Sequence, residues 1–257
     1  MASKIVAKRK TIERDQMILK ILEENGFTSV HDLCQKLYFS EATIRRSLTT
    51  LARKGLIHRT HGGAELLKTF TNAGPFSSRI ALNALAKRNI ARKASELVAD
   101  GSIVFLDQST TAFYLAEALK EKKDLTIVTN NIEIVNLLST TNCKVYVSGG
   151  YLSDEARTCL VGTDAHQIFL KTYADYVFFS TRSLSADGIA SDCNREEINV
   201  RNAMLKYAKC KILLCDSSKF NTSSGFIQCT LQDLDILISE EDAAGIYAPL
   251  FSRLKCL

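Results

Sequence analysis

Residues 40–51 of the chain read SEATIRRSLTTL, and residues 55–64 read GLIHRTHGGA. In the first segment Ile44, Leu48 and Leu51 recur at helical spacing and form one apolar stripe. The second segment begins at a glycine and has the pattern of two short strands joined by a tip. The two segments therefore predict a helix with one buried side, followed by a β wing.

Two more helices are predicted before these segments. The first spans roughly residues 12–24, where apolar residues recur at helical spacing, and Asn25-Gly26 ends it. The second begins at Ser29, whose spacing to Asp32 is that of a capping box. A short turn then leads to Ser40, the predicted cap of the third helix. Helices joined in this way and followed by a wing predict a winged helix-turn-helix.

The exposed side of the third helix carries cations and hydroxyls, which suit the major groove of DNA. Arginine can donate two hydrogen bonds to guanine, and threonine can bind phosphates or bases. The wing adds a cation and a histidine that would lie near the sugar–phosphate backbone or the minor groove. An ordinary solvated helix face is the alternative interpretation. The predicted DNA-binding residues are Ser40, Thr43, Arg45, Arg46, Thr49, Arg59 and His61.

Positive charge is concentrated in the first quarter of the chain. Residues 1–63 hold 12 Lys and Arg against 6 Asp and Glu, whereas residues 64–257 hold 21 against 22. This asymmetry indicates a polyanionic partner, double-stranded DNA, for the first domain alone. One small winged helix buries too little surface for tight specific binding, so we expect a homo-oligomer, a dimer or tetramer, on paired half-sites.

Punctuating residues divide the chain near Pro75. Gly62-Gly63 ends the wing, and Gly74-Pro75 follows in a stretch without clear periodicity. We predict a DNA-binding domain over residues 1–63, a linker over 64–80, and an effector-binding and oligomerisation domain over 81–257.

The predicted second domain alternates apolar runs with helical segments. Near-continuous apolar strands separated by helices indicate an α/β domain with a mostly parallel sheet covered on both faces. The helical segments include residues 112–119, 132–139 and 196–208. The predicted strands are residues 103–107, 125–129, 143–148, 175–180, 210–216 and 234–239.

Polar residues follow four of these strands, at the carboxyl ends where such sheets bind ligands. Hydroxyls that open a helix can bind an anion together with its first amides, glycines allow close backbone approach, and a lysine adds a cation. A helix cap, a plain turn and a surface lysine are alternatives for the single groups, but their repeated placement favours a pocket. The predicted effector-binding residues are Asp107, Ser109, Thr110, Thr111, Thr129, Asn130, Asn131, Gly149, Gly150 and Lys219.

These residues carry a resemblance to the DeoR family of bacterial regulators, which has T-I-R-R-D-L in its recognition helix and R-x-H-G-G-A in its wing. Ser47 stands where the family has aspartate, beside the predicted DNA-facing arginines, so operator preference is expected to differ. The resemblance continues through L-D-x-x-T-T, V-T-N-N, G-G and D-S-S-K-F, and through a run R-x3-N-x3-K-x2-I-A-x2-A formed by Arg79, Asn83, Lys87, Ile90, Ala91 and Ala94.

The resemblance implies a sugar-phosphate-isomerase-like fold for the second domain. It also implies that the 107–111 loop holds phosphate or sugar hydroxyls, that Lys219 pairs with phosphate, and that Asp107, Asn130 and Glu196 contact the sugar. Ser109 departs from the glycine of many relatives, and its Cβ would narrow the loop. The implied protein is a regulator, most often a repressor of sugar-metabolism genes, controlled by a non-covalent phosphorylated sugar.

Composition argues against several other classes of protein. The eight cysteines form no C-x-x-C pair and no zinc-ligand spacing, so we expect reduced thiols, no metal and no bound cofactor beyond the effector. No apolar run reaches the ~18 residues of a membrane span, and the polar N-terminus lacks a signal-peptide apolar region. We therefore expect a cytoplasmic protein without membrane association.

Two alternatives to a ligand-controlled regulator stay open. One is a phosphosugar isomerase-like enzyme that carries a helical domain, with Asp107, Asp187 and Glu196 as acidic candidates. We expect no catalytic residues, because His166 is the only histidine of the second domain and precedes an apolar segment. The other is a DNA-binding protein whose second domain only oligomerises.

Overall fold

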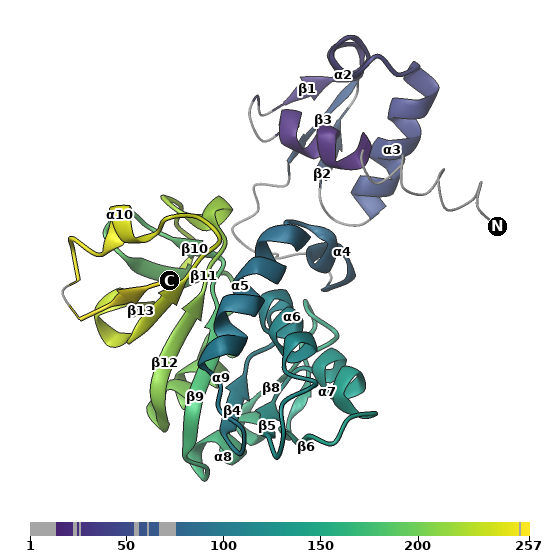
Figure 1. Cartoon of the computed structure of the whole chain (residues 1–257). Helices are drawn as coiled ribbons and strands as arrows, with labels where there is room; N and C mark the ends of the chain where they lie inside the picture. Colours follow the sequence, from purple (N-terminus) through teal and green to yellow (C-terminus); the bar gives the residue numbers. More distant parts are fainter. Residues whose placement is uncertain are drawn as a thin grey trace. The chain divides into compact units, whose positions relative to one another are not determined.

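The computed structural model describes residues 14–22, 25, 27–53, 57–60, 62–66, 76–251 and 253–257 (Figure 1). The chain divides into two compact units, Met1–Thr69 and Phe70–Leu257, called here the N-terminal and C-terminal domains. Strand β3 (Gly63–Leu66) continues past the boundary expected at residue 63, and helix α4 (Phe76–Ala81) lies largely within the expected linker 64–80. Among the described residues, none of the helices has both the length and the apolar content to cross a bilayer.

The N-terminal domain has the predicted order of helices and wing. Residues 14–22 are helical. They are followed by β1 (Thr28–Ser29), α2 (Val30–Leu37), α3 (Glu41–Arg53), β2 (Ile57–Thr60) and β3. The wing strands β2 and β3 pair antiparallel, and β1, which the sequence did not predict, adds a third strand in the order β1-β3-β2.

Apolar stripes of the three helices form the core of this domain, as their spacing predicted. The buried side chains are Ile18, Leu22, Val30, Leu33, Ile44, Leu48, Leu51, Ile57 and Ala64. Backbone conformation and close packing explain why glycines occupy positions 62 and 63 of the wing. Gly62 has φ +91°, which favours glycine, and a Cβ on Gly63 would lie 2.6 Å from the carbonyl oxygen of Thr28.

The C-terminal domain is built on a seven-stranded sheet in which every pair is parallel. All six predicted strands lie in it, and the seventh, at one edge, was not predicted. From edge to edge the strands are β15 (Lys255–Cys256), β14 (Ile236–Ile238), β12 (Ala208–Leu214), β9 (Ala174–Ser180), β4 (Ile103–Leu106), β5 (Thr126–Thr129) and β6 (Lys144–Val147).

Helices cover both faces of the sheet, and each face has its own apolar cluster. One cluster joins alternate strand residues such as Val104 and Phe178 to α5 (Ala84–Leu97), α6 (Thr110–Ala118) and α7 (Ile132–Leu138) (Figure 1). The other joins Phe105 and Phe179 to side chains of three further helices. These are α8 (Thr163–Leu170), α9 (Arg195–Lys206) and α10 (Ala244–Tyr247).

The C-terminal domain also contains short strands and 3₁₀ turns outside the parallel sheet, which the sequence analysis did not predict. Antiparallel pairing forms a three-stranded sheet in the order β10-β11-β13 and a two-stranded sheet β7-β8. Their bounds are β7 (Tyr151–Leu152), β8 (Leu160–Val161), β10 (Ser183–Leu184), β11 (Ile189–Asp192) and β13 (Phe226–Thr230), and two 3₁₀ turns span Ser217–Lys219 and Leu231–Asp233.

The order of the strands creates a switch point between β4 and β9. From β4 the chain proceeds to β5 and β6 on one side, and then returns to β9 on the other side of β4. In open parallel sheets, ligands bind outside the carboxyl ends of strands at such a reversal. The topology therefore predicts a ligand site among the residues that follow β4 and β9.

Candidate functional site

The exposed side of α3 presents the predicted cations to solvent. Arg45 and Arg46 are both exposed. Arg45 forms an ion pair of 2.6 Å with Glu41, one helical turn earlier. Arg59 of the wing donates a hydrogen bond of 2.8 Å to the hydroxyl of Thr49. The structure thus brings recognition helix and wing cations onto one connected surface.

The start of α3 is organised by hydroxyls. Ser40 Oγ accepts a hydrogen bond of 3.4 Å from the Thr43 amide and lies 2.9 Å from the Thr43 hydroxyl. Ser40 is exposed, and Thr43 is half-buried. His61, the remaining predicted DNA-binding residue, lies outside the described residues.

Ser47 lies on the buried side of α3, although it directly follows the exposed Arg45 and Arg46 in the sequence. Its side chain is 1% exposed and accepts a hydrogen bond of 2.7 Å from Arg14 Nε of the first helix. The departure from aspartate therefore concerns the packing of helix one on α3 rather than a direct contact with bases.

In the C-terminal domain, Asp107 lies at the switch point and is fully buried. One carboxylate oxygen accepts a hydrogen bond of 3.0 Å from the Ser109 amide. The other accepts from the Ser180 amide at 3.1 Å and from Arg201 Nε at 2.9 Å. Asp107 thus joins the ends of β4 and β9, and its carboxylate is occupied by protein donors.

Lys219 reaches the same strand ends from the turn after β12. Its Nζ donates a hydrogen bond of 2.9 Å to Ser180 Oγ and lies 3.4 Å from the carboxylate of Asp216. Burial alone would raise the pKa of Asp216, but the Lys219 ammonium and the hydrogen bond from Ser218 outweigh it and hold that pKa at about 2. Asp216 is therefore ionised at neutral pH, with the Lys219 side chain beside it.

The polar residues that follow β4 and β5 cap helices and meet each other. Ser109 Oγ caps α6 by accepting from the Ala112 amide at 3.0 Å, and Asn131 caps α7 by accepting from the Glu133 amide at 2.9 Å. Asn130 Nδ2 approaches Gln108 Oε1 at 3.4 Å. The residues after β4 and β5 thereby meet at the carboxyl ends of these strands, and Lys219 contacts the end of the neighbouring strand β9 through Ser180. Thr110 and Thr129 are buried.

Four buried polar atoms at these strand ends have no hydrogen-bond partner within the described part of the chain. They are Thr111 Oγ1, Asn130 Oδ1, Asn131 Nδ2 and Asp216 Oδ2, the last of which lies 3.4 Å from Lys219 Nζ. Burying a polar atom without a partner costs roughly 1–3 kcal/mol, so such atoms are uncommon and point to a missing partner. Thr111, Asn130 and Asn131 follow β4 and β5, and their unpartnered atoms favour a polar ligand at the carboxyl ends of these strands.

Glu196 lies beside a separate hollow, and the predicted pair Gly149-Gly150 directly precedes Tyr151, which lines the same hollow. Glu196 accepts a short hydrogen bond from the Tyr151 hydroxyl, and both line a hollow of ≈ 220 Å³ with His166. Gly150 has φ +97° and leaves no room for a Cβ against the Val161 carbonyl, so its role here is close packing.

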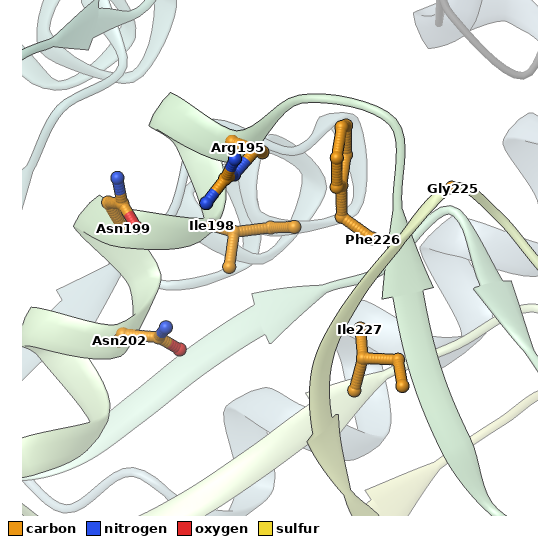
Figure 2. A pocket seen from close by; sticks show the side chains of 7 residues that line it. All are labelled: Arg195, Ile198, Asn199, Asn202, Gly225, Phe226 and Ile227. Carbon is orange, nitrogen blue, oxygen red and sulfur yellow. The ribbon is translucent and has the colours of Figure 1, made fainter.

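A second hollow, of ≈ 410 Å³, lies between α9 and β13. Figure 2 shows Arg195 and Asn199 on the helix facing Phe226 and Ile227 across it. The guanidinium of Arg195 stands 5.5 Å from the centre of the Phe226 ring. None of the predicted effector residues lines this hollow.

A buried ionic network supports the strand ends, and the sequence analysis missed it. Arg201 of α9 donates to Asp107 and to Asp192 at 2.9 and 2.7 Å, and lies 3.4 Å from Glu197. Burial tends to raise the pKa of Asp192, but Arg201 holds it below its usual range. Burial raises the pKa of Glu197 despite Arg201. The one signal in the sequence was the Glu197–Arg201 spacing of four residues.

In the portions of the chain that are described, no group of three or more His, Cys, Asp or Glu side chains could hold a metal ion.

Comparison with known families accounts for both domains. A DeoR-like helix-turn-helix domain matches residues 14–70, and a DeoR C terminal sensor domain matches residues 82–241. An L-fucose operon activator from Haemophilus influenzae is 33% identical over 88% of this chain and 91% of its own length. A putative aga operon transcriptional repressor from Escherichia coli O157:H7 is 30% identical over 95% of this chain and 91% of its own. Both relatives are named as regulators and not as enzymes.

A more distant likeness is found among solved structures. A ribose 5-phosphate isomerase A from Methanocaldococcus jannaschii aligns with 54% of this chain and 55% of its own, at 15% identity and a TM-score of 0.41. This likeness is too distant to indicate a chemistry for the chain.

Proposed function

This chain belongs to the DeoR family of DNA-binding transcription regulators, and we propose that it represses genes of sugar metabolism under the control of a phosphorylated sugar. In this proposal the N-terminal domain binds an operator and the C-terminal domain binds the effector at the strand ends. The protein acts in the cytoplasm as a homo-oligomer, because paired half-sites need at least two recognition helices.

The DNA-binding part of the proposal is carried by the exposed cations of α3 and the wing. Arg45 and Arg46 stand on the face opposite the buried stripe, and Arg59 is bonded to the same helix through Thr49. The ion pair of Arg45 with Glu41 is exposed, so it can be exchanged for a phosphate or a base at little cost. We assign Ser40, Thr43, Arg45, Arg46, Thr49 and Arg59 to DNA contact.

The effector part is carried by one observation, the presence of a cation and of unpaired buried polar atoms at the carboxyl ends of the strands on both sides of the switch point. Lys219 supplies the charge for a phosphate, and Thr111, Asn130 and Asn131 supply hydrogen-bonding atoms for hydroxyls. The helix that begins at Thr110 adds its first amides, which favour an anion. Asp107 would act chiefly by holding these groups in place, because its own carboxylate is engaged.

The test compares two single variants of the full chain. Operator DNA is selected from a random duplex library with the wild-type protein, and binding is followed by fluorescence anisotropy with and without ribose 5-phosphate, glucosamine 6-phosphate or glycerol 3-phosphate. Lys219→Ala should abolish the ligand response and leave DNA binding, while Arg45→Ala should weaken DNA binding and leave stabilisation by the ligand in a thermal-shift assay unchanged.

A ligand response that survives in Lys219→Ala would show that the site lies elsewhere. No stabilisation of the wild type by any of these compounds in a thermal-shift assay would favour a C-terminal domain that only oligomerises. A reporter gene placed behind the selected operator distinguishes repression from activation. Activation is the role for which the Haemophilus relative is named.

A further inference from the structure

The end of α4 is held by side chains of neighbouring helices. Lys87 Nζ, from α5, donates to the carbonyl oxygens of Arg79 and Leu82 at 2.5 and 2.7 Å. The Tyr114 hydroxyl, from α6, donates to the carbonyl oxygen of Ile80 at 3.0 Å. A helix of six residues is too short to be stable alone, so α4 depends on these donors and on the packing of Phe76 against Phe113 of α6.

The residue that joins α4 to α5 is bonded to the candidate effector site. Asn83 has φ +52°, and its Nδ2 donates to Asp216 Oδ1 at 3.1 Å and to Ser218 Oγ at 2.9 Å. Both acceptors belong to the turn that carries Lys219. The junction of α4 and α5 is therefore connected directly to the proposed phosphate-binding turn.

Lys87 is sensitive to charge at that turn. It is 5% exposed. Burial and the positive charge of Lys219 lower its pKa to about 7, while Asp216 acts in the opposite direction. An anion placed beside Lys219 would offset this repulsion, favour the protonated form of Lys87 and strengthen its hydrogen bonds to the α4 carbonyls.

We propose that Lys87 and Asn83 are positioning residues that couple anion binding at Lys219 to α4, so that an occupied site fixes the end of this helix more firmly. The inference rests on the proposed function, since it needs an anionic effector at the strand ends. Along the chain, α4 is the first described helix after the wing strand β3. A change in how α4 is held is thus passed toward the DNA-binding domain, with a coupling set by the differential stability of the two states.

Hydrogen–deuterium exchange of the full chain tests the coupling at α4 itself. At saturating ribose 5-phosphate, glucosamine 6-phosphate or glycerol 3-phosphate, whichever binds, amides of residues 79–83 should exchange about 5- to 150-fold more slowly in the wild type. In Lys87→Met this slowing should be absent, although the ligand still binds. Lys87→Arg keeps the charge and should restore at least part of the slowing.

A matched control lies on the same helix. Lys93 also donates to a backbone carbonyl, that of Ser239, at 2.8 Å, but it does not contact α4 in the bonds described. Lys93→Met makes the same substitution on α5 and should leave the response of α4 intact. Asn83→Ala removes the link to Asp216 without changing charge, and it should reduce the coupling as Lys87→Met does.

The operator assay separates failure of the coupling from failure of the proposed function. If ligand shifts the operator affinity of Lys87→Met and Asn83→Ala as much as that of the wild type, the coupling is wrong and the regulator proposal stands. If none of the three compounds binds the wild type, the proposed function fails and the coupling fails with it. Loss of the shift in both variants, with the shift retained in Lys93→Met and Lys87→Arg, supports the proposal.

Discussion

In the N-terminal domain, Arg45 pairs with a glutamate one turn away, and the two side chains are 49% and 63% exposed. In the C-terminal domain, Arg201 contacts three carboxylates contributed by different elements, and it is 4% exposed. An exposed pair contributes little to stability and can change partners, whereas a buried one leaves unpaired charge when it is broken. The comparison suggests that DNA contact and folding use separate residues in the first domain, while ligand binding and folding share them in the second.

The largest effect is expected from a substitution that breaks the buried ionic network of Arg201. Arg201→Met removes the partner of Asp107 and Asp192 and should lower the free energy of unfolding of the C-terminal domain by about 3–5 kcal/mol. Urea unfolding followed by circular dichroism measures it, since the chain has no tryptophan. Arg92→Ala, which breaks an exposed pair with Glu96, is the control and should cost no more than about 0.5 kcal/mol. Equal losses for the two variants would contradict the comparison.

For the exposed arginines of α3, we predict a loss of operator binding without a loss of folding stability. Arg45→Ala or Arg46→Ala should weaken operator binding by about 1–3 kcal/mol, or roughly 5- to 150-fold, because each arginine reads a base or neutralises a phosphate. Anisotropy titrations at several salt concentrations measure this, and loss of a phosphate contact would reduce the salt slope by about one.

Arg157→Ala provides the control for these titrations. Arg157 is an exposed arginine of the C-terminal domain that pairs with Asp154 at 3.5 Å, and its removal should leave operator affinity unchanged. If Arg45→Ala lowered the unfolding free energy as Arg201→Met does, the proposed separation of roles would be lost.

The sequence predicted the parts of this structure that depend on local patterns. Apolar runs predicted six of the seven strands of the parallel sheet, and helical spacing predicted the core of the N-terminal domain. Strand β15 spans only Lys255–Cys256, and such a short strand has no run of its own to detect. It forms because the edge of β14 is available for pairing, which is a property of the tertiary structure.

The candidate site shows the same limit at the level of single residues. Asp107 was predicted from its place after a strand, and it does lie at the switch point. Its partner Arg201 is 94 positions away along the chain, so nothing local indicates that the carboxylate is already engaged. Ser47 shows the same limit, because Arg45 and Arg46 before it are exposed while its own buried side chain accepts a hydrogen bond from Arg14 of another helix.

The pH dependence of the free energy of unfolding tests how burial affects the charge of Lys87. The pKa of Lys87 is about 7 in the folded protein against an ordinary value of 10.5. Between these values the unfolded chain binds the proton that the folded chain has lost, so stability should rise with pH. Relative to Lys87→Met, the unfolding free energy of the wild type should rise by at most about 1.4 kcal/mol per pH unit from pH 7 to 10 and stay level below pH 6. A flat difference over the whole range would show that Lys87 keeps its ordinary pKa.

The smallest expected effect compares the two serines that cap functional helices. Ser109 is 6% exposed and accepts from Ala112 N at 3.0 Å, whereas Ser40 is exposed and accepts from Thr43 N at 3.4 Å. Ser109→Ala should therefore cost about 1 kcal/mol of stability and Ser40→Ala less, measured by urea unfolding. Glycine is a tolerated cap that costs only a few tenths of a kcal/mol, so Ser109→Gly should nearly preserve stability. If Ser109→Gly then also binds sugar phosphates as well as the wild type, the Ser109 hydroxyl serves only as a cap; weaker binding in a stable variant assigns it to the ligand as well.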